Sequence, residues 1–223
     1  MQVKICGLTN LEDALVAVEA GADLLGFILY TKSPRYLTPE QVGTITQTIR
    51  AQAGDRAPRF VGVFVDATAD QLTDAMQVAG LDYAQLQGAE SPDVLAALAG
   101  RAYKALRPTS VADAEEAAER YAALGTPNGP GLLIDAYDVH EYGGTGKKAD
   151  WHAAAALART YPRLMLAGGL NPSNVAQAIR TVQPWAVDVA SGVEIEPRRK
   201  DHAAVRAFVA TAKQARKQEE TTP

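Results

Sequence analysis

Two side chains in this sequence could transfer protons to and from a small substrate, although they lie far apart in the chain. Cys6 follows the short apolar run "QVKI" and is the only cysteine among the 223 residues. Asp135 interrupts the apolar run "LLIDAY" (132–137), where a carboxylate is costly unless it is hydrogen-bonded or faces a cavity. A thiolate can act as a general base and a carboxylic acid as a general acid. The pair therefore indicates acid–base catalysis, provided that the fold brings the two groups together.

The protonation states of this pair must be shifted in opposite directions. As a base, Cys6 needs a pKa below its usual value of about 8.5, and a neighbouring cation lowers it. Lys4 lies two residues earlier, on the same face of an expected strand, and is the obvious cation. As an acid, Asp135 needs a pKa above about 3.9, which partial burial or a bound anion would provide. Without such neighbours, Cys6 would be interpreted as a buried packing residue.

Short apolar runs alternate with longer amphipathic segments along the chain. The segment 10–22 has apolar residues at helical spacing, with Thr9 or Asn10 as a candidate N-cap and Gly21 as a stop. Further pairs of this kind follow, with the last helix expected over 198–217 and a frayed polar tail over 218–223. The expected strands are 2–7, 24–30, 59–65, 82–88, 102–108, 131–137, 163–169 and 186–192.

Strict alternation of strands and helices predicts a parallel sheet with right-handed crossovers. Most of the strands are continuous apolar runs, as expected for strands that are covered on both faces. Eight such pairs predict an α/β fold with one domain, a (β/α)8 or TIM barrel, over residues 1–217. A doubly wound open sheet is the alternative, but no G-x-G-x-x-G follows the first strand.

In such a barrel the site lies at the carboxyl ends of the strands. Glycine-rich segments follow the last three strands at 142–146, 167–174 and 190–194. The loops after strands seven and eight are the usual phosphate site of this fold, because backbone N–H groups there can approach an anion closely. A helix start near Asn171 and a short turn after Ser191 would add positive dipole ends. Polar candidates at the strand ends are Lys4, Cys6, Gln85, Gln87, Lys104, Arg107, Asp135, Asp188 and Ser191.

Composition excludes several classes of protein. The formal net charge of −4 argues against a nucleic-acid-binding surface, which needs a basic excess. A single cysteine rules out an intramolecular disulfide, and no apolar run approaches the roughly 20 residues that span a bilayer. We find no pattern of a secretory signal. The expectation is a cytoplasmic monomer or homodimer that binds a phosphorylated small molecule, without a nucleic-acid or membrane partner.

Several segments together resemble phosphoribosylanthranilate isomerase of tryptophan biosynthesis. They are "VKICG" (3–7), "GFILYTKSPRY" (26–36), "GVFV" (62–65), "LLIDAY" with "YGGTGKKADW" (132–151), "LAGGLNPSNVAQAI" (166–179) and "VDVASGVE" (187–194). They occur in order from the first strand to the last, so the resemblance covers nearly the whole chain. It implies a single-domain (β/α)8 isomerase of the aldose–ketose class that needs no cofactor and no metal. The implied reaction is the Amadori rearrangement of N-(5-phosphoribosyl)anthranilate to 1-(2-carboxyphenylamino)-1-deoxyribulose 5-phosphate.

The resemblance also implies roles for individual residues. Cys6 would be the base that removes the proton from C2 of the ribose, and Asp135 the acid that protonates the ring oxygen. Arg35 would hold the anthranilate carboxylate, which suits a guanidinium fork. The other expected substrate-binding residues are Lys4, Gln87, Gly144, Gly168, Gly169, Asp188, Ser191 and Gly192.

The chain departs from the family pattern at two positions. Gln87 stands where the family more often has histidine, so it can hydrogen-bond but cannot titrate, and Ala149 stands where an aromatic residue is common. Two alternatives remain open at this level. A ribonucleotide isomerase of histidine biosynthesis, or a bifunctional barrel, would be expected to carry an aspartate in place of Cys6. A non-catalytic phosphate-binding barrel would not need both Cys6 and Asp135.

Overall fold

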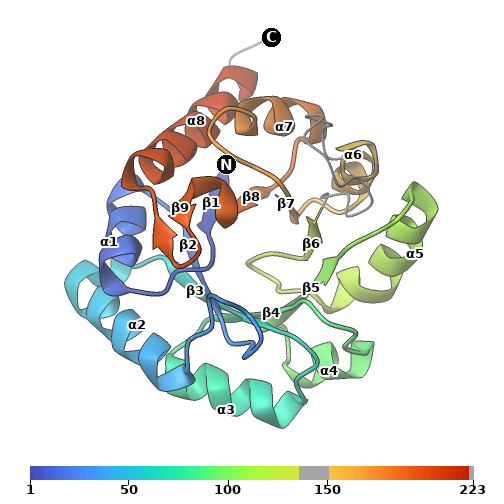
Figure 1. The fold of residues 1–223 in the computed structure, drawn as a ribbon. Coiled ribbons are helices and arrows are strands. Elements are labelled where there is room, and N and C mark those ends of the chain that lie inside the picture. The colour runs from blue at the N-terminus through green and yellow to red at the C-terminus, as the bar shows by residue number, and fades with distance from the viewer. Residues whose placement is uncertain (136–150, 221–223) are drawn as a thin grey trace.

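The computed structural model describes residues 1–135 and 151–220, and within them eight parallel strands form a closed barrel (Figure 1). The first strand pairs with both the second and the eighth, which closes the sheet. The strands are β1 (Gln2–Ile5), β2 (Leu24–Ile28), β3 (Arg59–Phe64), β4 (Tyr83–Leu86), β5 (Ala102–Leu106), β6 (Leu132–Asp135), β7 (Leu164–Ala167) and β8 (Ala186–Val189). The TIM barrel predicted from the sequence is confirmed.

Helices surround this barrel, one after each strand along the chain (Figure 1). They are α1 (Leu11–Ala20), α2 (Pro39–Ala53), α3 (Ala69–Ala79), α4 (Pro92–Ala97), α5 (Val111–Tyr121), α6 (Trp151–Thr160), α7 (Val175–Val182) and α8 (His202–Glu220). Short 3₁₀ turns are η1 (Gly54–Arg56), η2 (Ala122–Leu124) and η3 (Ser191–Val193). Because neighbours in the barrel follow chain order, the ends of β6, β7, β8 and β1 lie next to one another.

Local sequence signals set the helix ends. The Asn10 side chain accepts a hydrogen bond from the Asp13 backbone N–H at 2.8 Å and so caps α1, as expected. Gly21 ends the same helix with φ of 90°, in the left-handed region that favours glycine. Thr38 and Gln41 form a capping box at the start of α2, where each side chain bonds the other residue's backbone N–H.

Apolar side chains form two layers, one outside the strands and one within the barrel. The outer layer fills the space between strands and helices. The inner layer is a separate cluster of Leu24, Val61, Tyr103, Ala105, Leu133, Met165, Ala167 and Ala186, with Tyr83 and Trp185 packed against it. Side chains therefore fill the barrel interior, and a ligand must bind above this layer, at an end of the barrel.

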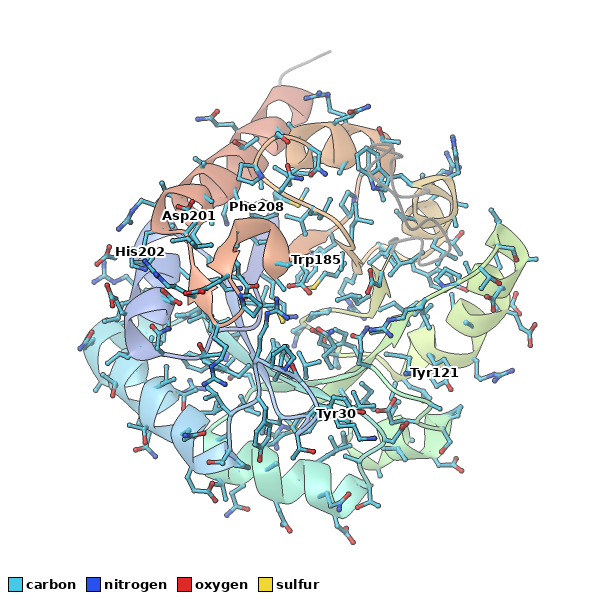
Figure 2. All side chains as sticks on the ribbon, viewed as in Figure 1. Tyr30, Tyr121, Trp185, Asp201, His202 and Phe208 are labelled. Carbon is cyan, nitrogen blue, oxygen red and sulfur yellow. The ribbon has the colours of Figure 1, made fainter. Side chains whose placement is uncertain are left out.

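The segment after β8 differs from the expected single helix over 198–217. It forms a small antiparallel hairpin, β9 (Glu194–Glu196) with β10 (Arg199–Lys200), before α8 begins. The helix starts late because Asp201 Oδ1 accepts hydrogen bonds from the backbone N–H groups of Ala203 and Ala204 and so caps it. Asp201 and His202 lie together at this helix start (Figure 2).

The other end of α8 also differs from the expectation. The helix continues to Glu220, three residues beyond Lys217. The part of the chain that the structure describes contains no helix with the length and apolar character needed to cross a membrane.

Candidate active site

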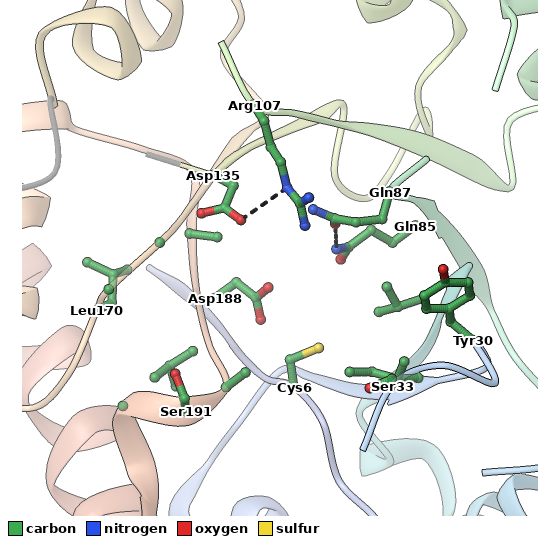
Figure 3. Close-up of a pocket in the computed structure, with 18 of the residues that line it drawn as sticks. Cys6, Tyr30, Ser33, Gln85, Gln87, Arg107, Asp135, Leu170, Asp188 and Ser191 are labelled. Atoms are coloured by element: carbon green, nitrogen blue, oxygen red, sulfur yellow. Dashed lines mark hydrogen bonds and ion pairs between the residues drawn. The ribbon is translucent and has the colours of Figure 1, made fainter. Parts of the chain in front are cut away.

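A pocket of about 630 Å³ opens at the carboxyl ends of the barrel strands, a size that suits a small organic ligand. Cys6 lies on one side of Asp188 and Asp135 on the other, with Ser191 along a neighbouring edge (Figure 3). The expected site residues that line the pocket are Cys6, Gln87, Asp135, Gly168, Gly169, Asp188, Ser191 and Gly192. Gly144 and the "YGGTG" segment lie outside the described residues.

Cys6 directly follows β1 and is buried, with 5% of its surface exposed. Gly26 on the neighbouring β2 makes room for it. A Cβ at Gly26 would lie 2.7 Å from Cys6 Sγ and 2.9 Å from Lys4 Cε, which is closer than real atoms approach. Sequence reasoning did not assign a role to Gly26, because only the three-dimensional contact distinguishes it from an ordinary strand glycine.

The electrostatic environment of Cys6 differs from the expectation. Burial raises the pKa of the Cys6 thiol, and the Lys4 ammonium lowers it by less. Asp188 raises this pKa further, and Lys200 lowers it. The prediction of a lowered pKa is therefore wrong for the site without substrate, because a thiolate in this enclosed position loses its hydration.

Lys4 lies beneath the pocket instead of lining it, in contrast to its expected contact with substrate. Its fully buried ammonium donates hydrogen bonds to Gln85 Oε1 at 2.7 Å and to Asp188 Oδ2 at 3.1 Å. Burial alone would lower the pKa of Lys4, but the Asp188 carboxylate reverses this and raises it. Gln85 Nε2 in turn donates to Gln87 Oε1 at 2.7 Å. Lys4 thus fixes two pocket residues directly and Gln87 through Gln85.

Asp135 ends β6 at the pocket and keeps a quarter of its side chain exposed. Arg107 lies across from it, with Nε 3.6 Å from Asp135 Oδ2 (Figure 3). The Arg107 side chain is 63% exposed, so solvent screens this ion pair and its contribution is about 1 kcal/mol or less. Arg107 was among the strand-end candidates but had no assigned role, since its pairing with Asp135 depends on the packing of β5 beside β6.

The loops after β7 and β8 have the backbone that a phosphate site needs. Gly168 and Gly169 have φ of 96° and 61°, which other residues rarely adopt. The turn expected after Ser191 is present as η3. The helix start expected near Asn171 is wrong, because α7 begins at Val175. Asn171 Oδ1 accepts bonds from Ser173 and from the Asn174 N–H, and the Asn171 carbonyl accepts one from the Val175 N–H, so residues 171–174 form a turn that leads into α7.

We predict that Gly192→Ala weakens phosphate binding. A Cβ on Gly192 would lie 1.9 Å from the Leu170 carbonyl oxygen, so the two glycine loops would have to move apart. Loss of one or two bonds to an anion corresponds to about a tenfold rise in the dissociation constant of inorganic phosphate. Gly131→Ala is the control, because its nearest contact would be an ordinary 3.5 Å. An unchanged dissociation constant of phosphate in Gly192→Ala would contradict a phosphate site at these loops.

Arg35 is held beside the pocket and does not line it. Its Nε and Nη2 donate to the two carboxylate oxygens of Glu194 at 2.8 and 2.5 Å. Its side chain crosses Gly7, where a Cβ would lie 2.7 Å from Arg35 Cδ. Sequence reasoning included Glu194 in the "SGVE" motif but did not identify it as the partner of Arg35, because 159 residues separate the two.

A closed (β/α)8 barrel with a thiol, a carboxylate and two glycine loops around one pocket defines a class of protein. Barrel enzymes of this kind place their reactive side chains and their loop backbone around a pocket at the carboxyl ends of the strands. The chain belongs to the N-(5'-phosphoribosyl)anthranilate isomerase family, whose model matches residues 3–211.

Known proteins resemble the chain over nearly its whole length. The N-(5'-phosphoribosyl)anthranilate isomerase of Geobacter sp. (strain M21) is 47% identical over 215 residues, which cover 95% of this chain and 98% of that protein. A structure of monomers of the dimeric Thermotoga maritima isomerase is 36% identical, with a TM-score of 0.81. A structure of phosphoribosyl anthranilate isomerase in complex with reduced 1-(o-carboxyphenylamino)-1-deoxyribulose 5-phosphate is also 36% identical, with a TM-score of 0.81. Both alignments cover 96% of this chain and 99% of the other.

Proposed function

We propose that this barrel rearranges N-(5-phosphoribosyl)anthranilate to 1-(2-carboxyphenylamino)-1-deoxyribulose 5-phosphate, with Cys6 as general base and Asp135 as general acid. The observation that carries the assignment is the opposed placement of these two groups around one pocket (Figure 3). Cys6 follows β1 and Asp135 ends β6, and the glycine loops after β7 and β8 lie between them in the barrel order. A substrate anchored by its phosphate at these loops would extend between the acid and the base.

The proposed reaction moves protons within one substrate and needs no outside reactant. Asp135 donates a proton to the ring oxygen as the bond from C1 to that oxygen breaks, which leaves an iminium at C1. Cys6 then removes the proton from C2, and the electron pair of that bond forms an enolamine. The enolamine tautomerises to the ketone. The bound iminium makes the C2 proton more acidic, so a single thiolate suffices as the base.

Asp188 is the proposed partner of a ribose hydroxyl. Its Oδ2 is held by Lys4, whereas Oδ1 is buried and has no hydrogen-bond partner among the described residues. A buried carboxylate oxygen at a pocket wall is stabilised by a donor from the ligand. Gln87 follows β4, four strands away from β8 in the barrel order, and adds a neutral contact that cannot titrate.

Arg35 is the proposed partner of the anthranilate carboxylate. Within the described residues its guanidinium bonds to Glu194 through Nε and Nη2, which leaves Nη1 for a carboxylate. Neighbouring Tyr30 and Ser33 line the pocket, so a small movement of this loop would bring Nη1 to the substrate. We also propose a cytoplasmic enzyme that is a monomer or a homodimer, in agreement with the dimeric Thermotoga maritima relative.

A fluorescence assay tests the function directly. Phosphoribosylanthranilate is formed in situ from anthranilate, and its fluorescence should decay when the purified protein is added without metal or nucleotide. Turnover of the ribonucleotide substrate of histidine biosynthesis in a parallel assay would indicate a bifunctional barrel. No decay, together with retained phosphate binding, would indicate a non-catalytic binding protein and would contradict the proposal.

The pH profile of kcat/KM should be bell-shaped, with its alkaline limb above the usual thiol range. The reactive form has one proton on Asp135 and none on Cys6, and it contains the same number of protons as the form with Cys6 protonated and Asp135 ionised. On the alkaline side, activity is therefore lost when the last proton leaves the pair, at the pKa of Cys6. Because burial raises that pKa, the fall lies at high pH. Steady-state rates across pH measure this limb, and a fall near neutral pH would contradict it.

A further inference from the structure

Lys200 is a buried lysine that lies next to the pocket and does not line it. It ends the β10 strand with 1% of its side chain exposed. Its ammonium donates to the Cys6 carbonyl at 2.6 Å, the Ala190 carbonyl at 2.9 Å and Glu194 Oε1 at 3.0 Å. A lysine ammonium has three N–H donors, so each of them has a protein partner and none remains for a substrate.

The three acceptors belong to three different parts of the site. Cys6 carries the proposed base, and Ala190 directly precedes the η3 turn of the phosphate loop. Glu194 holds the guanidinium of Arg35 at the rim. One cation therefore fixes the thiol segment, the anion loop and the expected carboxylate-binding arginine relative to one another.

The backbone of Lys200 is itself held by a side chain of α1. Its N–H donates to Asp13 Oδ2 at 3.0 Å. Asp13 lies on α1, is 4% exposed and also accepts a bond from Asn10 Nδ2 at 2.9 Å. His202, at the start of α8, places its Nε2 2.8 Å from Asp13 Oδ1 (Figure 2). The hairpin and the first and last helices thus hold the lysine in place before substrate binds.

We propose that Lys200 is a positioning residue of the isomerase site, which holds Cys6, the η3 phosphate loop and the Glu194–Arg35 pair in their working geometry. This inference rests on the proposed function. Catalytic groups must be held within a fraction of an ångström, and a small misplacement can reduce the rate a hundredfold. A buried ammonium with three acceptors provides this constraint because its bonds to carbonyls and carboxylate are charge-assisted.

The same ammonium also acts on the charge of the Cys6 thiol. Burial lowers the pKa of Lys200 and Glu194 raises it against that effect, while Lys200 in turn lowers the pKa of Cys6. The charged and titratable groups that act on the thiol are Lys4 from β1, Tyr103 from β5, Asp188 from β8, Lys200 from β10 and Arg35 from the loop after β2. Removing Lys200 leaves Asp188 and burial with less opposition, so the thiol should become harder to ionise.

Lys200→Met tests the proposal with two readouts. Cys6 is the only cysteine, so the rate of iodoacetamide alkylation against pH reports its ionisation alone. We expect this profile to move about one pH unit higher and kcat to fall about a hundredfold. Lys213→Met is the matched control, because Lys213 makes a partly exposed ion pair with Asp23, and its loss should leave both readouts unchanged. The proposal would be overturned if the alkylation profile stayed at the wild-type pH and kcat stayed within twofold of the wild-type value.

Lys200→Arg keeps the test decisive if the methionine variant does not fold. Arginine retains the charge but places its donors in a planar fork that cannot match three separate acceptors. The alkylation profile should then stay near that of the wild type while kcat falls about tenfold, and an unchanged kcat would overturn the positioning role. If the wild-type protein itself lacks isomerase turnover, the proposed function fails, and the alkylation profiles still report whether Lys200 acts on Cys6.

Discussion

Cys6→Ser is expected to lower kcat about a thousandfold and to leave KM within a few-fold of the wild type. Loss of a general base costs about 10²–10⁴ in rate, and a serine hydroxyl ionises far less readily than a thiol. Substrate binding should persist, because the proposed phosphate, hydroxyl and carboxylate contacts involve other residues. Steady-state decay of substrate fluorescence gives both constants.

The serine variant changes little in the packing of the site. Sulfur and oxygen fill similar space beside Gly26, so the melting temperature should stay close to that of the wild type. Cys6→Ala provides the control, since a similar loss of kcat in both variants identifies the missing base and not an altered volume. Turnover within tenfold of the wild type in both variants would contradict the role of Cys6.

Asp135→Asn is expected to lower kcat about 10²–10⁴-fold, because an amide keeps the shape of the carboxyl group but cannot protonate the ring oxygen. Its second effect concerns the pH profile. With only Cys6 left to titrate, the residual rate should rise with pH through the pKa of the thiol, where the wild-type rate falls. This reversal of slope distinguishes loss of the acid from a general loss of structure, which would lower the rate at every pH.

Arg107→Leu is the control for this prediction. It removes the ion pair with Asp135 but leaves the carboxyl group in place, so the profile should keep its bell shape. A bell-shaped profile in Asp135→Asn, with its alkaline limb still falling, would contradict the assignment of Asp135 as the acid. The two variants together separate the proton that Asp135 supplies from the charge that Arg107 supplies.

The fold could be predicted from the sequence because its signals are local and repeated. Apolar runs alternate with amphipathic segments, and capping residues such as Asn10 and Thr38 mark the helix starts. The hairpin before α8 could not be predicted in this way. Its segment is short and polar, and Lys200 bonds there to the carbonyl of Ala190 and to that of Cys6, which is 194 residues away in the chain.

Much of the candidate site also followed from the sequence. In a (β/α)8 barrel the residues at strand ends must gather at one face, so Cys6, Asp135 and the two glycine loops were predicted to meet. The glycine loops could be identified from the sequence alone, because the conformational freedom of glycine depends on the residue type and not on its contacts. The element order and residue types at the strand ends therefore determined which groups surround the pocket.

Only the tertiary structure decided how those groups interact. Lys4 is 184 residues from Asp188, and Lys200 is 194 residues from Cys6, so neither contact leaves a local pattern in the sequence. The direction of the Cys6 pKa shift was mispredicted for the same reason. That shift is a sum of burial and several opposing charges, and its sign depends on distances that exist only once the barrel has closed.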